Sequence, residues 1–340
     1  MLPIDTYTGA YEIDLRTRPD STTAAGPAGI DSIADSAVDR HVRRGLGSRE
    51  AIRFIDPDGD SRSVTYARLS DQGRRFAGAL DLLGIPAGTV VLTLLPRRWE
   101  LHTSMVGALR HGSSVLPLAS SLGPSSATGR LNHPSARILV TTDELRRRHL
   151  TRLPDDSALT MLVTGPIEGP LPLGAYDLRA LMAQASDIVS EPTDEVSATV
   201  LHHLTDPPRY DGRLTAAGWH RPTDVVWYAA DSDWITADPS VDLPTLMSGA
   251  TAVVDEGEFD VDRWYSIVER ERVTVWYLGA DDLRWLRWAG AEAAEQHDLM
   301  SLRHIITVGE PPSSRLLTWA RETLGVPVYQ NSHDPALVPV

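Results

Sequence analysis

Short apolar runs alternate with segments of helical spacing along most of the chain. In the first half, runs at 90–95, 114–118 and 136–140 precede predicted helices at 99–110, 125–131 and from 142 onward. The second half repeats this scheme with predicted strands at 225–228, 251–254, 273–278, 304–308 and 326–329, and helices at 260–271, 281–295 and 312–323. Strands that alternate with helices favour parallel sheets joined by βαβ crossovers. The pattern therefore predicts an α/β protein.

The segments before this alternation carry clear turn signals. Helical spacing over 32–44 ends at Gly45, which suits a helix C-terminus. The strands predicted at 51–55 and 63–66 flank a Pro- and Gly-containing turn, which predicts a hairpin, and a helix follows to about residue 83. We therefore predict three parts: a flexible N-terminal arm at 1–30, a first α/β lobe at 31–190 and a second, truncated lobe at 191–340.

Composition and charge exclude several classes of function. A net charge of −14 argues against a nucleic-acid partner, which would favour a basic face. The chain has no cysteine, so it has no disulfide and no thiolate metal site. Its apolar runs are too short to cross a membrane, and the N-terminus has no apolar signal core. These features predict a cytoplasmic protein that binds neither nucleic acid nor membrane.

Tryptophan is concentrated in the second half, where eight of the nine lie from Trp219 onward. Trp285 and Trp288 are three residues apart and share a face of the predicted helix. Aromatic residues at helical spacing usually belong to a core, and we interpret these two as packing residues.

Five segments, in the same order, resemble acetyl-CoA synthetases, which are AMP-forming ligases of the adenylate-forming superfamily. They are VTYARL at 64–69, LPRRWEL at 95–101, WYAADSDWIT at 227–236, LMSGATAVVDEG at 246–257 and LRHIITVGEP at 302–311. The resemblance implies two packed, doubly wound sheet lobes, as in the large N-terminal domain of those enzymes. It also implies an adenine site at Gly309, Glu310 and Pro311, and a cleft motif that includes Asp231, Trp234 and Thr236.

The phosphate-binding loop of that family is degenerate here. The family sequence YTSGTTGKPKG is replaced by a stretch at 201–212 that includes Thr205, Asp206, Arg209 and Gly212. A phosphate loop needs glycines so that backbone N–H groups can approach the anion, whereas this stretch has two prolines and two acids. The whole chain also lacks lysine. These features disfavour binding of a triphosphate, so the expected nucleotide is AMP or another adenine compound, held weakly.

The C-terminal end departs from the family in a second way. The family has a Thr-Glu pair that binds magnesium and the adenylate, and the sequence at 329–334 here reads YQNSHD. The small lid domain of the family, with its catalytic lysine, would follow Val340, so we expect that domain to be absent. A chain that ends there is also expected to associate with a partner protein or with another copy.

Other chemistry has weaker signals. His202, His203 and His220 could suggest a metal site, but adjacent residues on a strand point to opposite faces, and no metal is expected. No catalytic residue is identified. Three hypotheses remain: a degenerate ligase homologue that binds a partner or a small ligand, an enzyme with new chemistry in the inherited cleft, and a ligase completed by another subunit. The first is preferred because of the altered loop and the absence of lysine.

Overall fold

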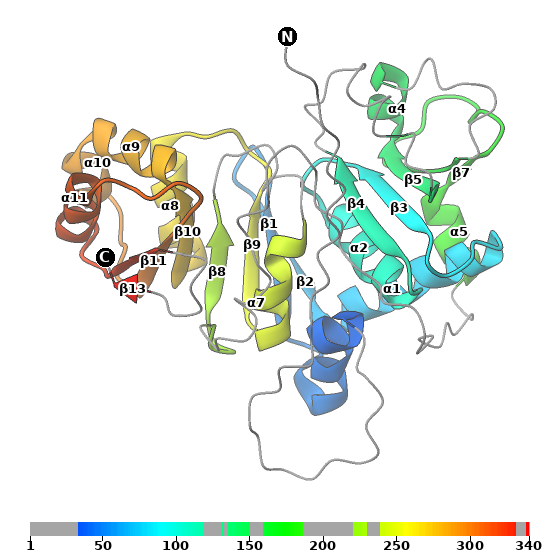
Figure 1. Cartoon of the computed structure of the whole chain (residues 1–340), viewed down its shortest axis with the longest axis horizontal. Helices are drawn as coiled ribbons and strands as arrows, with labels where there is room; N and C mark the ends of the chain where they lie inside the picture. Colours follow the sequence, from blue (N-terminus) through cyan, green and yellow to red (C-terminus); the bar gives the residue numbers. More distant parts are fainter. Residues whose placement is uncertain are drawn as a thin grey trace. The chain divides into compact units, whose positions relative to one another are not determined.

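The computed structural model describes residues 33–118, 131, 135–149, 159–185, 220–229, 239–330 and 338–339. They belong to two compact units, each with its own sheet (Figure 1). The first unit comprises Met1–Ser48, Tyr66–Pro208 and Ala237–Ser240, and the second comprises Arg49–Thr65, Arg209–Thr236 and Val241–Val340. The predicted arm at 1–30 and nearly all of the helix predicted at 125–131 lie outside the described residues.

The first unit is built on a parallel five-stranded sheet with the order β4-β3-β5-β6-β7. Its strands are β3 (Val90–Leu94), β4 (Ser114–Leu118), β5 (Ala136–Thr142), β6 (Thr160–Thr164) and β7 (Ala175–Asp177). Its helices are α1 (Tyr66–Leu82), α2 (Trp99–Arg110), α4 (Asp143–His149) and α5 (Leu178–Gln184), and the wide turns η1 (Asp35–Asp39) and η2 (Val42–Leu46) precede them. Every residue of β3 is buried, in agreement with its largely apolar sequence.

Helices α1 and α2 approach each other closely because two glycines face the contact. A Cβ atom at Gly107 would lie 2.5 Å from the Cβ atom of Phe76, and one at Gly73 would lie 2.8 Å from a methyl group of Val106. No real side chain fits at such distances. The glycines therefore set the spacing of the helix layer that covers this sheet.

The second unit has an eight-stranded sheet with the order β13-β12-β11-β10-β8-β9-β1-β2. Its strands are β1 (Glu50–Ile55), β2 (Ser61–Thr65), β8 (Val225–Tyr228), β9 (Thr251–Asp255), β10 (Val275–Gly279), β11 (His304–Val308), β12 (Val328–Gln330) and β13 (Val338–Pro339). Only the pairs β1–β2 and β12–β13 are antiparallel among the described strands. Its helices are α7 (Leu243–Ser248), α8 (Val261–Glu271), α9 (Ala280–Ala289), α10 (Ala291–Glu295) and α11 (Ser314–Leu324), and the short helix η5 (Pro239–Asp242) has residues in both units. Parallel sheets with helical crossovers confirm the predicted α/β class.

The β1–β2 hairpin corrects the predicted lobe boundary. Chain order assigned residues 51–66 to the first lobe, but β1 pairs in parallel with β9, with Ile52 opposite Ala252. The hairpin therefore belongs to the sheet of the second unit. Order along the chain does not determine which sheet a strand joins, and the largely buried β1 needs a neighbour on each side.

Tryptophan residues form the centre of the second unit. Trp227 on β8 and Trp276 on β10 are fully buried and stacked, with ring centroids 5.5 Å apart and planes at 8°. Trp264 of α8 meets both rings edge-on. In contrast, Trp285 and Trp288 were wrongly interpreted as packing residues, because 55% and 83% of their surfaces are exposed. They do share one helix face, but Leu283 and Leu286 form the face of α9 that is buried.

Candidate functional site

The topology of the second sheet indicates where a ligand would bind. From β8 the chain goes to β9 on one side, and then returns to β10 on the other side of β8. Ligands of open parallel sheets bind outside the carboxyl ends of the strands at such a switch point. The N–H of Ala229 donates to the carbonyl of Tyr277 at 3.0 Å, so β8 and β10 remain paired up to this edge.

Gly309, Glu310 and Pro311 lie at the same edge, directly after β11. All three are exposed. Gly309 has a φ of 79°, and a Cβ atom there would meet no atom within 4 Å, so conformation rather than crowding requires glycine. Ser313 then caps α11 by accepting a hydrogen bond from the N–H of Leu316. The loop is therefore open, anchored on both sides and able to offer its backbone to a flat ligand such as adenine.

The cleft residues Asp231, Trp234 and Thr236 lie outside the described residues, and so do Thr205, Asp206, Arg209 and Gly212 of the altered loop. Ala229, the last described residue before the cleft segment, lies at the switch point. The structure thus places Gly309, Glu310 and Pro311 at the carboxyl edge of the sheet, and both the adenine site and the chemistry of the phosphate side stay predictions.

A buried polar network occupies the opposite, amino edge of this sheet. The carboxylate of Asp224 accepts hydrogen bonds from Arg303 at 2.7 and 3.1 Å, from the hydroxyl of Thr274 at 3.0 Å and from the N–H of Arg221 at 2.7 Å. These residues precede β8, β10 and β11, so the network joins the starts of three strands. Sequence reasoning missed it, and the only signal was a charged residue just before each of two apolar strands.

His220 is the one described histidine of the three considered for a metal site. Its ring is buried, with Nε2 2.9 Å from the hydroxyl of Tyr277 and Nδ1 3.5 Å from the hydroxyl of Thr245. Within the described ranges, no group of three His, Asp or Glu side chains is arranged to hold a metal ion. His220 is therefore a packed core residue with polar partners.

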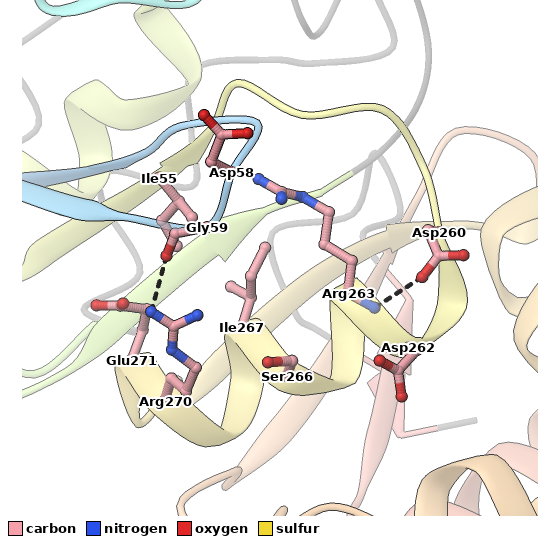
Figure 2. A pocket seen from close by; sticks show the side chains of 10 residues that line it. All are labelled: Ile55, Asp58, Gly59, Asp260, Asp262, Arg263, Ser266, Ile267, Arg270 and Glu271. Carbon is pink, nitrogen blue, oxygen red and sulfur yellow. Dashed lines mark hydrogen bonds between the residues drawn. The ribbon is translucent and has the colours of Figure 1, made fainter.

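A polar hollow of about 220 Å³ lies between the turn of the β1–β2 hairpin and α8 (Figure 2). It is lined by the carboxylates of Asp58, Asp260, Asp262 and Glu271, the guanidinium groups of Arg263 and Arg270, and Ile55, Gly59, Ser266 and Ile267. Arg270 donates to the carbonyl of Gly59 at 2.7 Å, as drawn in Figure 2. Arg263 donates to the carbonyls of Asp56 and Pro57 at 2.6 and 2.8 Å. Both arginines hold the hairpin turn against α8, and the hollow offers no free cation for a phosphate.

Comparison with known proteins identifies the family of the chain. A family model described as "AMP-binding enzyme" matches residues 38–189 and 208–331. The chain belongs to this family.

Several family members are similar over most of this chain. Acetyl-coenzyme A synthetase of Pyrobaculum aerophilum is 30% identical over 334 residues, which cover 85% of this chain and 50% of that protein. The Bacillus subtilis acetyl-coenzyme A synthetase is 27% identical over 315 residues, or 87% of this chain and 54% of that protein. A crystal structure of Brucella canis acyl-CoA synthetase matches with a TM-score of 0.77 and 26% identity, covering 93% of this chain and 62% of that one. The chain thus spans about half the length of the curated relatives that it matches. Among the described helices, none is long and apolar enough to cross a membrane.

One segment that resembles the acetyl-CoA synthetases has a structural role here. Asp255, at the end of β9, is buried and binds the guanidinium of Arg263 at 2.5 Å. A Cβ atom at Gly257 would lie 2.5 Å from the central carbon of that guanidinium. The Asp255-Glu256-Gly257 segment therefore supplies the charge and the space that allow Arg263 to bind the hairpin turn.

We expect the stability of the second unit to fall between pH 6.5 and pH 4 because of two buried histidines. Burial lowers the pKa of His220 to about 4 and that of His304 to about 4, from 6.5. Between these values the unfolded chain binds more protons, so stability decreases as the pH falls. Each histidine contributes at most about 1.4 kcal/mol per pH unit.

The measurement is the unfolding free energy in urea at several pH values. The double variant His220→Gln, His304→Gln cannot take up these protons and should show a flatter profile than the wild type. Parallel profiles for the two proteins would contradict the assignment.

Proposed function

We propose that this protein is a degenerate member of the AMP-binding family that binds an adenine compound or a partner protein and does not form acyl-adenylates. Support for the first part comes from the exposed loop of Gly309, Glu310 and Pro311 at the switch-point edge. Support for the second comes from the sequence at 205–212, which has two prolines and two acids, in a chain without lysine. Arginine does not simply replace lysine as a compact point charge beside a phosphate.

The loop at 309–311 suits an adenine base, whereas the sequence at 205–212 does not suit a chain of phosphate groups. Gly309 leaves open space beside its backbone, and Glu310 is free to approach a ligand edge because it is exposed. Bound AMP would supply a flat base for this loop, and the residues of the loop would orient it. Asp206 and Asp211 carry the same charge sign as phosphate and disfavour a third phosphate group.

The expected result is that purified protein releases no pyrophosphate from ATP with short carboxylic acids. Acetyl-coenzyme A synthetase of Bacillus subtilis, assayed in parallel, serves as the positive control. In calorimetry, AMP should bind at least as tightly as ATP with magnesium. Pyrophosphate release at an ordinary enzymatic rate, or a clear preference for magnesium-ATP, would contradict the proposal.

A matched pair of glycine variants tests the location of the adenine site. Gly309→Val forces a β-branched residue into a positive-φ conformation, and we expect it to weaken AMP binding at least about tenfold. Gly325→Val introduces the same strain at the end of α11, where φ is 70° and space is also open. AMP binding that survives Gly309→Val but not Gly325→Val would place the site elsewhere.

Partner binding is supported by one observation on the second unit. Trp285 and Trp288 are exposed together on α9, with ring centroids 6.0 Å apart. Tryptophan is enriched among the residues that dominate protein interfaces. We therefore keep the prediction that this protein associates with a partner or with a second copy. The cytoplasmic location also stays a prediction.

A further inference from the structure

A second hollow, in the first unit, has a different character from the polar one. It measures about 180 Å³ and lies where α1, the first residue of α2 and α5 meet the end of β6. Leu178 and Met182 of α5 are buried beneath it, and Trp99, 36% exposed, forms one wall. Such a combination of an apolar floor and an aromatic wall is typical of small-molecule sites. Its volume suits a ligand of fragment size.

The charged groups that line this hollow are cationic. Arg75 and Arg179 line it, together with the amide of Gln72. Arg75 donates to Asp71 at 2.8 Å, whereas Arg179 forms no ion pair within 4 Å in the described part of the chain. An exposed guanidinium beside a concave apolar surface can bind a carboxylate with two parallel hydrogen bonds. The positive rim is unusual in a chain whose net charge is −14.

The carboxyl group of Glu100 does not cancel the charge of Arg179 fully. Glu100 lies in the first turn of α2, within electrostatic range of Arg98 and Arg179. Burial raises the pKa of Glu100, which favours its neutral form compared with an exposed glutamate. One oxygen of its carboxyl group is buried and has no hydrogen-bond partner within the described ranges of the chain. The first turn of α2 also presents N–H groups, whose positive potential favours an anion nearby.

We propose that this hollow binds a small carboxylate with a flat apolar body. The flat body lies against the indole of Trp99 and over Leu178 and Met182, and the carboxylate accepts hydrogen bonds from Arg179, with Arg75 as the second cation. The site is separate from the adenine loop, because it belongs to the other compact unit.

The test uses benzoate as the probe and protein labelled with 5-fluorotryptophan. The ¹⁹F resonance of Trp99 is assigned from its loss in the Trp99→Phe variant. We expect benzoate to shift this resonance saturably, with a dissociation constant on the order of 1 mM. Acetate, which lacks the ring, and benzylamine, which has the opposite charge, should bind at least about tenfold more weakly.

Two arginine variants distinguish a built site from general attraction to positive charge. Arg179→Gln should weaken benzoate binding about tenfold, because it removes a charge-assisted hydrogen bond. Arg74→Gln is the matched control, because Arg74 is an exposed arginine of α1 that does not line the hollow. Equal binding by benzylamine, an unmoved Trp99 resonance, or equal effects of the two substitutions would overturn the proposal. Addition of AMP should leave the Trp99 resonance unchanged, so failure of either proposed site is detected separately.

Discussion

Replacing Trp276 with alanine is expected to destabilise the second unit by about 3–5 kcal/mol. Trp276 is fully buried and contacts the rings of Trp227, Trp264 and Tyr265. Neither its indole N–H nor that of Trp227 has a hydrogen-bond partner among the residues that the structure describes, so the expected loss comes from packing and from the cavity left behind. The measurement is the free energy of unfolding in urea, followed by circular dichroism.

Trp288→Ala is the control for this experiment. It removes the same side chain from α9, where 83% of the surface of Trp288 is already exposed. Surface substitutions of this kind usually change stability by no more than about 0.5 kcal/mol. If the two variants were equally stable, the stacked tryptophans would not be the centre of this core.

The second large effect is expected for Asp224→Asn, with a loss of about 2–4 kcal/mol. The substitution removes the charge that binds Arg303, whose side chain is only 28% exposed. It also disturbs the bonds from Thr274 and from the N–H of Arg221. The remaining guanidinium is then partly buried without its counter-ion, which is more costly than losing an exposed pair.

Asp298→Asn provides the comparison for the buried pair. Asp298 binds Arg272 at 2.9 Å, but the two side chains are 44% and 59% exposed, respectively. Exposed ion pairs typically contribute less than about 1 kcal/mol. The free energies of unfolding of the two variants, measured in urea, should therefore differ by more than about 1 kcal/mol. A smaller difference would mean that the network at the amino edge contributes little to the stability of the second unit.

The elements that could be predicted from the sequence are those whose local pattern is complete. The helix predicted at 99–110 is observed as α2 over the same residues, and the apolar run at 90–95 is β3. Strand β7 and helix α5 were not predicted, because β7 has only three residues, none of them buried, and α5 is only seven residues long. A helix or strand can be predicted from a single sequence when it is long and when one of its faces is buried.

Contacts between distant residues were beyond the sequence alone. The spacing of Trp285 and Trp288 correctly placed them on one face, but α9 has a second apolar stripe, and only one stripe can face the core. Likewise, nothing in the sequence indicates that Asp224 and Arg303 form an ion pair, because they are distant along the chain and only the folded sheet places them in contact. The loop at 309–311 is a candidate site by resemblance alone, because the proposed role would depend on an open backbone and not on a distinctive side chain.

The position of the β1–β2 hairpin has a consequence for synthesis of the chain. Strand β1 leaves the ribosome about two hundred residues before its partner β9. At typical elongation rates this is a wait of roughly 10–40 seconds. During that time a strand that is later largely buried has one unpaired edge, and such edges promote aggregation. The acids of the turn and the polar strand β2, which carries Arg62, place charges next to it, as gatekeeper residues do in other sequences prone to aggregation.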